Sequence, residues 1–378
     1  MQGECILDPK SRTGISRRTI VKAGLAASAV ALLPAAARRA AAQDSVVITM
    51  ITDTAGLGDQ NFNDLADRGG TQAATELGVD FRVIESVDQA AYVPNLTQGA
   101  QDSQLVIGVG FLLTDAITEV ATQFPDAFFQ LIDSVADVGN VQSVLFHEEQ
   151  IGYLAGIVAG ETTQSNKIGV IGGQRIPPVI RYEVGFVAGV NSVNPDAEIT
   201  IVYTDTFGDQ ALGKQTAAAQ FNDGADVIFP IAGFTGTGAY LAAAELNKPG
   251  EIWVVGVDTS QDHLAPGYEL CVAQKGVDFA VFNAAKQITE GTFQTGILNL
   301  GLAEGGVSLQ AIEGRASAES IALARAYEAL IVDGTIVPPV DDDTLASFVV
   351  PATPEVSASP VASPEASPMA SPEATPTA

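Results

Sequence analysis

Residues 46–54 read VVITMITDT, a nearly continuous apolar run that ends in Asp53 and Thr54. The same pattern recurs at 226–231 (DVIFPI) and at 252–258 (IWVVGVD). Runs of this kind, rich in β-branched residues and without polar alternation, are typical of parallel strands covered on both faces. They predict an α/β protein whose strands lie in the middle of its layers.

Segments of helical length and amphipathic spacing separate these runs, for example 63–77 and 210–222. Strand–helix units that recur every ~25–30 residues predict right-handed crossovers and doubly wound parallel sheets. The expected strands form two sets, which indicates two lobes. The first set is 46–52, 81–86, 105–109, 128–133 and 141–146, and the second is 167–171, 198–203, 226–231 and 252–258.

Residues 1–42 resemble a twin-arginine export signal. Arg17 and Arg18 precede a mild apolar run of 15 residues, which is followed by two further arginines and small residues. A membrane anchor is the alternative, but the run is shorter than the ~20 residues that span a bilayer. We expect cleavage after Ala42 and a mature protein in the periplasm or on the outer face of the cell membrane.

The last segment, residues 351–378, consists almost entirely of Pro, Ser, Ala, Thr and Glu, with a four-residue repeat from Ser359. Such a composition cannot bury a core, so we expect a disordered or extended spacer. A partner-binding proline-rich motif is the alternative.

The composition argues against several classes of partner and of metal or disulfide site. With 18 Lys and Arg against 45 Asp and Glu, the net charge of −27 argues against nucleic acid or an anionic membrane surface as partner. Two Cys and two His do not support a disulfide framework, a zinc ribbon or a histidine-rich metal site. We therefore expect no cofactor and no metal, and binding rather than catalysis.

Ligands of doubly wound sheets bind beyond the carboxyl ends of the strands. Carboxylates, aromatic rings and glycines gather at those ends here, and Lys and Arg are scarce. Such a cleft suits a neutral ligand with a ring and hydroxyl groups, and it does not suit a phosphate or a carboxylate. The residues after the strands are Asp53, Thr54, Gly110, Phe111, Asp133, Gly172, Gly173, Asp205, Thr206, Phe207, Gly233–Gly236 and Asp258.

Residues 52–63, TDTAGLGDQNFN, resemble the opening motif of the basic membrane protein family. These are periplasmic-type substrate-binding proteins of ABC importers and include purine nucleoside receptors. The resemblance spans nearly all of 46–340 and continues, in order, through 108–117, 131–156, 168–190, 207–214, 226–238, 254–262, 272–281 and 322–339.

The resemblance implies a type I periplasmic-binding-protein fold over 43–350, with two Rossmann-like doubly wound lobes, three crossovers and a hinged ligand cleft. Lobe 1 would hold about 46–147 plus 259–290, and lobe 2 about 148–258 plus 291–345. It also implies a monomer that delivers a nucleoside to the transmembrane subunits of an ABC permease.

The family's ligand contacts fall on identifiable positions of this chain. Phe62 and Phe207 would stack on a base, and Asp133 would address its edge. Asp258 and Lys275 would hold the ribose hydroxyls. The remaining implied contacts are Asp53, Thr54 and Gly233.

Each of these residues also has a structural interpretation. Aspartates at strand ends serve as helix caps and turn formers, the phenylalanines could belong to the core, and Lys275 could simply pair with Asp258. Phe234 departs from the family, which has a glycine there, and would narrow the cleft or add a ring. Glu148 and Glu149 are expected at a helix N-terminus.

Other functions stay open at this point. A nucleoside hydrolase would use the clustered aspartates, a sensor would dock to a membrane signalling protein, and a sugar could replace the nucleoside as ligand.

Overall fold

The computed structural model describes residues 46–354. The predicted export signal, residues 1–42, and all but the first four residues of the predicted tail lie outside the described residues. Within 46–354, no helix is long and apolar enough to cross a membrane.

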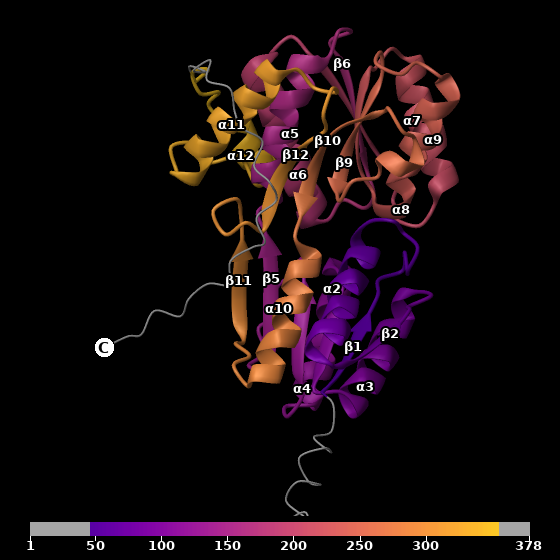
Figure 1. Cartoon of the computed structure of the whole chain (residues 1–378), viewed down its shortest axis with the longest axis vertical. Helices are drawn as coiled ribbons and strands as arrows, with labels where there is room; N and C mark the ends of the chain where they lie inside the picture. The colour runs from indigo at the N-terminus through magenta and orange to yellow at the C-terminus, as the bar shows by residue number, and fades with distance from the viewer. Residues whose placement is uncertain (1–45, 355–378) are drawn as a thin grey trace, which may run out of the picture. The chain divides into compact units, whose positions relative to one another are not determined.

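The first sheet is entirely parallel, with the order β2-β1-β3-β4-β5-β11 (Figure 1). In β1, Thr49 pairs with Arg82 of β2 on one side and with Val106 of β3 on the other. The strands are β1 (Val47–Ile51), β2 (Asp80–Ile84), β3 (Leu105–Gly108), β4 (Phe128–Ile132), β5 (Val141–Phe146) and β11 (Gly296–Leu300).

Helices cover both faces of this sheet. The pair α2 and α10 shares one core with Met50 and Ile107, and the pair α3 and α4 shares another with Ile51 and Val106. Because side chains alternate along a strand, the two faces receive alternate residues, and most positions of β1, β3 and β4 are apolar. The helices are α2 (Phe62–Leu77), α3 (Tyr92–Asp102), α4 (Thr114–Gln123) and α10 (Val277–Glu290), with the 3-10 turns η1 (Gln89–Ala91) and η2 (Phe111–Leu113).

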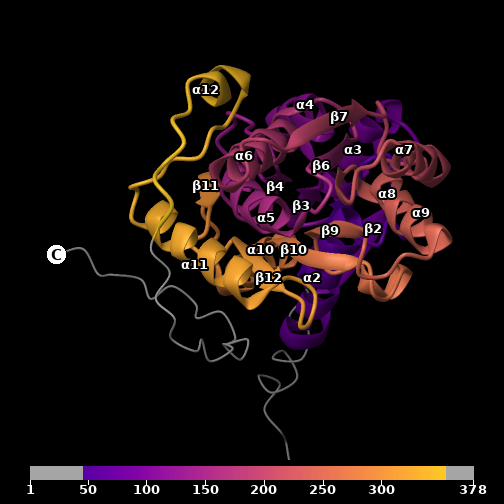
Figure 2. The same cartoon turned by 90° about the horizontal axis from the view of Figure 1, so that it is seen from above.

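The second sheet has the order β7-β6-β8-β9-β10-β12 and is parallel except at β12, which runs antiparallel to β10. Figure 2 shows α5 and α6 on one side of it and α7 and α9 on the other. The strands are β6 (Lys167–Gly172), β7 (Glu198–Tyr203), β8 (Val227–Ile231), β9 (Trp253–Asp258), β10 (Glu269–Lys275) and β12 (Val307–Ala311).

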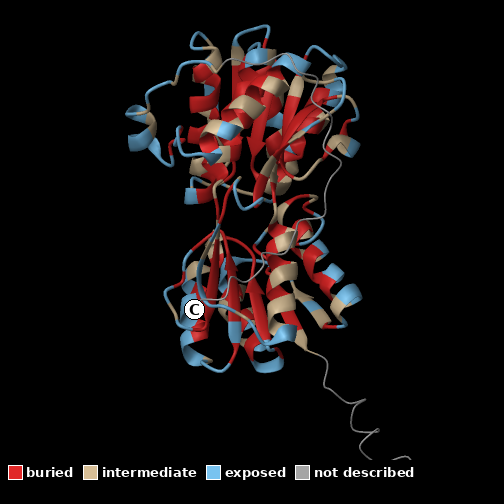
Figure 3. Cartoon of the chain, turned by 60° about the vertical axis from the view of Figure 1, so that its left-hand side comes forward, coloured by how far each residue is buried: buried red, intermediate tan, exposed pale blue. Residues whose placement is uncertain are grey.

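The helices around the second sheet fill the rest of the described chain. Figure 3 shows most of the inner strands buried, while exposed residues lie on loops, on outer helix faces and on edge strands such as β7 and β11. The helices are α5 (Glu148–Thr162), α6 (Pro177–Val193), α7 (Gln210–Asn222), α8 (Gly233–Gly236), α9 (Gly238–Leu246), α11 (Ala318–Val332) and α12 (Asp342–Ala346), with the 3-10 turn η3 (Asp262–Leu264).

The chain passes between the sheets three times in the described range, after β5, after β10 and after β11. The points of exchange differ from those expected. Residues 269–275 belong to the second sheet and 296–300 to the first, so the assignment of 259–290 to lobe 1 and 291–345 to lobe 2 needs correction. The reason is that β10 completes a run of five parallel strands in lobe 2, as β5 does in lobe 1, and only the sixth strand of each sheet is exchanged.

The helices α5 and α6 cross in backbone contact. Gly152 and Gly156 on α5 face Gly185 and Gly189 on α6, and a Cβ built on Gly189 would lie 2.1 Å from the carbonyl oxygen of Tyr153. No larger residue fits at that distance. The glycines therefore set how close α6, which carries residues of the cavity described below, lies to the start of α5.

We expect Gly189→Ala to destabilise the protein by about 1–3 kcal/mol, because the added methyl group forces the two helices apart. Urea denaturation followed by circular dichroism measures this. Asn191→Ala, two residues further along α6, serves as control and should change stability by less than about 0.5 kcal/mol. Equal stability of the two variants would contradict the close crossing.

Candidate functional site

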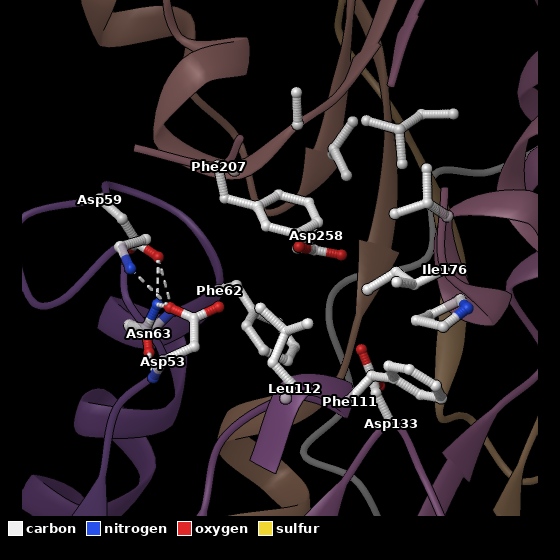
Figure 4. Close-up of a pocket in the computed structure, with 18 of the residues that line it drawn as sticks. Asp53, Asp59, Phe62, Asn63, Phe111, Leu112, Asp133, Ile176, Phe207 and Asp258 are labelled. Atoms are coloured by element: carbon white, nitrogen blue, oxygen red, sulfur yellow. Dashed lines mark hydrogen bonds between the residues drawn. The ribbon is translucent and has the colours of Figure 1, made fainter. Parts of the chain in front are cut away.

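A cavity of about 610 Å³, counted to its opening, lies where the strand ends of both sheets meet. Both sheets have the strand order 2-1-3-4-5, and the lining residues follow the strands beside the switch point of each sheet, as expected for ligand sites in such folds. Figure 4 shows the labelled side chains around this space.

Seven of the eight predicted site residues line the cavity: Asp53, Phe62, Asp133, Phe207, Gly233, Asp258 and Lys275. The exception is Thr54, which is exposed and does not line it. The backbone turns directly after β1, because the Ala55 and Gly56 amides donate to Asp53, and Thr54 is left at the surface.

Asp133 and Asp258 both adopt a left-handed backbone, with φ of 71° and 61°. This conformation is uncommon for residues other than Gly, Asn and Asp. The phenolic hydroxyl of Tyr182 donates to Asp258 Oδ1 at 3.0 Å. Burial is the main reason that the pKa of Asp258 rises to about 7, and the nearby Asp133 carboxylate raises it further while Lys275 opposes the rise.

Asp53 is held by a network at the start of α2. The Asn63 amide donates to Asp53 Oδ1 at 2.8 Å and to Asp59 Oδ2 at 2.9 Å. The Ala55 backbone amide also donates to Asp53 Oδ1. Burial raises the pKa of Asp53 to about 6 in spite of these donors. One carboxylate oxygen of Asp53 is thus fixed by protein donors while its side chain faces the cavity.

Lys275 pairs with Asp133 and Glu148, and not with Asp258 as considered from the sequence. Its ammonium lies 2.6 Å from Asp133 Oδ2 and 2.8 Å from Glu148 Oε1, and it is almost fully buried. These anions raise the pKa of Lys275 although burial acts to lower it. The simple Lys275–Asp258 ion pair is therefore replaced by a bridge from Lys275 to Asp133 and Glu148.

The pairing leaves Asp133 with an unused acceptor. Its Oδ1 is buried and has no hydrogen-bond partner. Burial raises the pKa of Asp133 to about 6, and the positive charge of Lys275 acts against this rise. A buried acceptor of this kind costs free energy until a donor reaches it, so it favours a ligand that brings an N–H or O–H group.

Three phenylalanine rings line the cavity. Phe62 begins α2 in lobe 1, Phe111 follows β3, and Phe207 lies between β7 and α7 in lobe 2 (Figure 4). Phe234 does not line it, so the departure from the family at that position neither narrows the cavity nor adds a ring. The third ring comes from Phe111 instead.

The Phe207 ring rests on the backbone of Gly173. A Cβ at Gly173 would lie 2.2 Å from Phe207 Cε1. We expect Gly173→Ala to move the ring and weaken ligand binding roughly tenfold, since stacking contributes about 1–3 kcal/mol per base, with little change in stability. Gly208→Ala, where only the Thr54 carbonyl oxygen lies at 4.0 Å, is the control. Comparable affinities of both variants in calorimetric titration would contradict a contact by Phe207.

Sequence reasoning missed other lining residues, chiefly those on α6 and at the start of α2. Asn63 and Tyr182 both lie in segments quoted for the family resemblance, which was the only signal for them. The missed residues are Ala55, Asp59, Asn63, Leu112, Ile176, Pro178, Val179, Tyr182, Ile231, Ala232 and Val257.

The two lobes also touch beside the cavity. The Gln261 side-chain amide donates to the Gln60 carbonyl at 3.2 Å, and His263 Nε2 lies 2.7 Å from Gln60 Oε1. Gln261 is positioned by Glu269, which accepts from its backbone N–H at 2.8 Å. Gln60 precedes Phe62 by two residues, so these bonds join the loop before Phe62 to the loop after β9.

The other clusters noted in the sequence have structural partners. Asp209 caps α7, Asp341 caps α12, and Asp342 pairs with Arg175. As expected, Glu148 is the first residue of α5. Within residues 46–354, no group of three or more His, Cys, Asp or Glu side chains is arranged to hold a metal ion.

The profile of the family described as ABC transporter substrate-binding protein PnrA-like (Bmp) matches residues 46–339. A solute-binding protein of an ABC transporter from Aeropyrum pernix superposes with a TM-score of 0.74 at 31% identity, covering 80% of this chain and 96% of that one. The fold and cavity thus define a periplasmic-type substrate-binding protein with the type I fold.

Two curated relatives narrow the class. The CD4+ T-cell-stimulating antigen of Listeria monocytogenes is 36% identical over 309 residues, which is 76% of this chain and 87% of the relative. The ABC transporter nucleoside-binding protein BmpA of Lactococcus lactis is 32% identical over 351 residues, 86% of this chain and 99% of the relative. The chain belongs to the Bmp family of ABC transporter substrate-binding proteins.

Proposed function

We propose that this protein captures a purine nucleoside between its two lobes and delivers it to an ABC permease. The observation that carries the proposal is the pairing, in one cavity, of phenylalanine rings from both lobes with the carboxylates of Asp53, Asp133 and Asp258 and the buried ammonium of Lys275. The name of the Lactococcus lactis relative supports it.

The rings favour a flat heterocycle. Phe62 and Phe207 approach the cavity from different lobes, so a base between them contacts both faces only when the lobes are together. Stacking on an aromatic face contributes about 1–3 kcal/mol per base and accepts any base. The rings therefore supply affinity, and the choice among ligands falls to the polar groups.

The carboxylates favour a ligand that donates several hydrogen bonds. The donors to Asp53 and Asp258 described above go to one oxygen of each carboxylate, Oδ1, and Asp133 keeps a buried free Oδ1. Base N–H groups and ribose hydroxyls match this requirement. A phosphate does not, since Lys275 is the one Lys or Arg among the lining residues and is already bound to two carboxylates.

The remaining parts of the proposal concern location and partners. We propose export by the twin-arginine segment, a monomeric protein at the outer face of the membrane, and binding without turnover. A Pyrococcus horikoshii relative that is 34% identical over 283 residues is named a lipoprotein, which supports a place at the cell envelope.

Calorimetric titration tests the ligand. The full chain, freed of carried-over ligand by unfolding and refolding, is titrated with adenosine, guanosine, inosine, cytidine, uridine, free bases, ribose and galactose. We expect saturable binding of purine nucleosides at micromolar or lower concentration. Binding of galactose or ribose without nucleosides would replace the proposal by a sugar receptor, and release of free base from inosine would replace it by a hydrolase.

Affinity should depend on pH. The ligand's donors need ionised carboxylates, and the pKa of Asp258 lies at about 7 with those of Asp53 and Asp133 at about 6. As the pH falls below 7, protons compete with the ligand, and affinity should drop by up to about tenfold per pH unit for each proton displaced. Titrations from pH 8 to pH 5 measure this. If the affinity does not change over that range, the role of the carboxylates is contradicted.

A further inference from the structure

Glu148 is a fully buried carboxylate that lies outside the cavity. It is the first residue of α5 and follows β5, so it sits on the first passage of the chain between the lobes. A buried carboxylate is costly unless it is paired. Arg181 Nε on α6 lies 2.6 Å from its Oε2, and Lys275 Nζ lies 2.8 Å from its Oε1.

Lys275 lies at the second passage, as the last residue of β10. Its ammonium is 5.1 Å from the centre of the Phe62 ring and 5.0 Å from that of Phe146. It bridges Asp133 at the end of β4 in lobe 1 and Glu148 at the start of α5. Two carboxylates thus fix the position of the Lys275 ammonium in the cavity wall: Asp133, which lines the cavity, and Glu148, which does not.

Glu148 is the carboxylate that contacts both cations of this cluster, Lys275 and Arg181, whereas Asp133 contacts Lys275 alone. Without the Glu148 charge, Arg181 loses its ion-pair partner, and Lys275 would be drawn toward the carboxylates that line the cavity. Without Arg181, Glu148 would draw Lys275 away from Asp133.

We propose that Glu148 and Arg181 are positioning residues for nucleoside binding, which hold the Lys275 ammonium on Asp133 Oδ2 so that Asp133 Oδ1 stays free for the ligand. The pair acts behind the cavity and does not touch the ligand. This inference rests on the proposed function for its binding readout, with guanosine as the probe.

Glu148→Gln keeps the shape and removes the charge. We expect guanosine affinity at pH 8 to fall roughly tenfold, as for the loss of a hydrogen bond to a charged group. The Glu148 charge also raises the pKa of Asp133 and Asp258. In Glu148→Gln the pH midpoint of binding should therefore move down by about one unit.

Arg181→Gln should move the midpoint the other way. The Arg181 charge lowers the pKa of Asp133, so its removal raises that pKa and shifts the midpoint upward. Arg181 is partly exposed, and this variant keeps the test available if Glu148→Gln does not fold. Damage to the structure alone would weaken binding without opposite shifts in the two variants.

Glu149→Gln is the matched control. Glu149 is also a buried carboxylate in the first turn of α5, but it pairs with His147 at 2.7 Å rather than with Lys275. Lys275 and Arg181 are the charged groups that act on Glu148, and the Glu148 charge acts in turn on Asp133, Asp258, Tyr182 and His147. Glu149→Gln should leave guanosine affinity within about twofold and its midpoint unchanged.

The experiment combines guanosine titrations from pH 8 to pH 5 with NMR titration of the aspartate carboxyl carbons in the ligand-free full chain. Opposite shifts for Glu148→Gln and Arg181→Gln in both measurements support the inference. Shifts of the same sign, or none, overturn it. If the wild type binds no nucleoside, the proposed function fails, while the NMR titration still decides whether the pair sets the Asp133 and Lys275 charges.

Discussion

Replacing Lys275 with Met is expected to destabilise the protein by about 3–5 kcal/mol at pH 8. The substitution keeps most of the apolar stem and removes the ammonium that lies between Asp133 and Glu148. Both carboxylates are buried, and breaking a buried pair leaves an uncompensated charge. Binding should be lost as well, because the Asp133 carboxylate then lacks the cation that keeps it ionised.

The loss of stability should shrink as the pH falls toward 5. Without Lys275, the folded pKa of Asp133 and Glu148 lies above the unfolded value of about 4. A carboxylate with a raised folded pKa destabilises the protein above its unfolded pKa, and this cost decreases as the pH falls from the folded pKa toward the unfolded pKa. Urea denaturation at pH 8 and pH 5 measures both values.

Lys214→Met is the control, since Lys214 pairs with Glu245 at the surface. It should cost less than about 1 kcal/mol at either pH. A Lys275→Met variant as stable as the control at pH 8 would show that the bridge is not the buried ion pair described.

Asp258→Asn is expected to weaken nucleoside binding by roughly 10- to 150-fold, the value of a hydrogen bond to a charged group. Asn is chosen because it tolerates the left-handed φ of 61° that Ala would find strained. The Tyr182 hydroxyl can still donate to the amide oxygen. The expected loss therefore reflects the missing carboxylate and not a distorted backbone.

Asp205→Asn is the matched control, because Asp205 is also an aspartate with positive φ, is exposed and does not line the cavity. Calorimetric titration of both variants with guanosine measures the difference. Equal affinities would remove Asp258 from the site.

Much of the fold could be predicted from sequence because buried parallel strands leave long apolar runs. All nine expected strands are present, with ends shifted by no more than two residues. The three strands not expected, β10 to β12, are more polar or more exposed. The strands β11 (GILNL) and β12 (VSLQA) are edge strands and lack a long apolar run. The exchange of the sixth strands between the sheets could therefore not be predicted from apolar runs.

The candidate site could be predicted in part for a related reason. Asp53, Asp133 and Asp258 lie at the end of a strand or within two residues of it, so the topology alone brings them to one place. The partners of Lys275 could not be predicted, since Glu148 is distant in sequence and only the path of the chain between the lobes brings it near. Thr54 shows the limit of the approach, because one tight turn after β1 decides which side chain faces the cavity.

A crystal structure of the full chain with guanosine tests the central claim most directly. The account predicts the purine ring between Phe62 and Phe207, a base N–H group on Asp133 Oδ1, and ribose hydroxyls on Asp258. Guanosine bound away from this cavity would contradict the account. So would guanosine bound in the cavity without contact to Phe62 or Phe207, or without contact to the carboxylates of Asp53, Asp133 and Asp258.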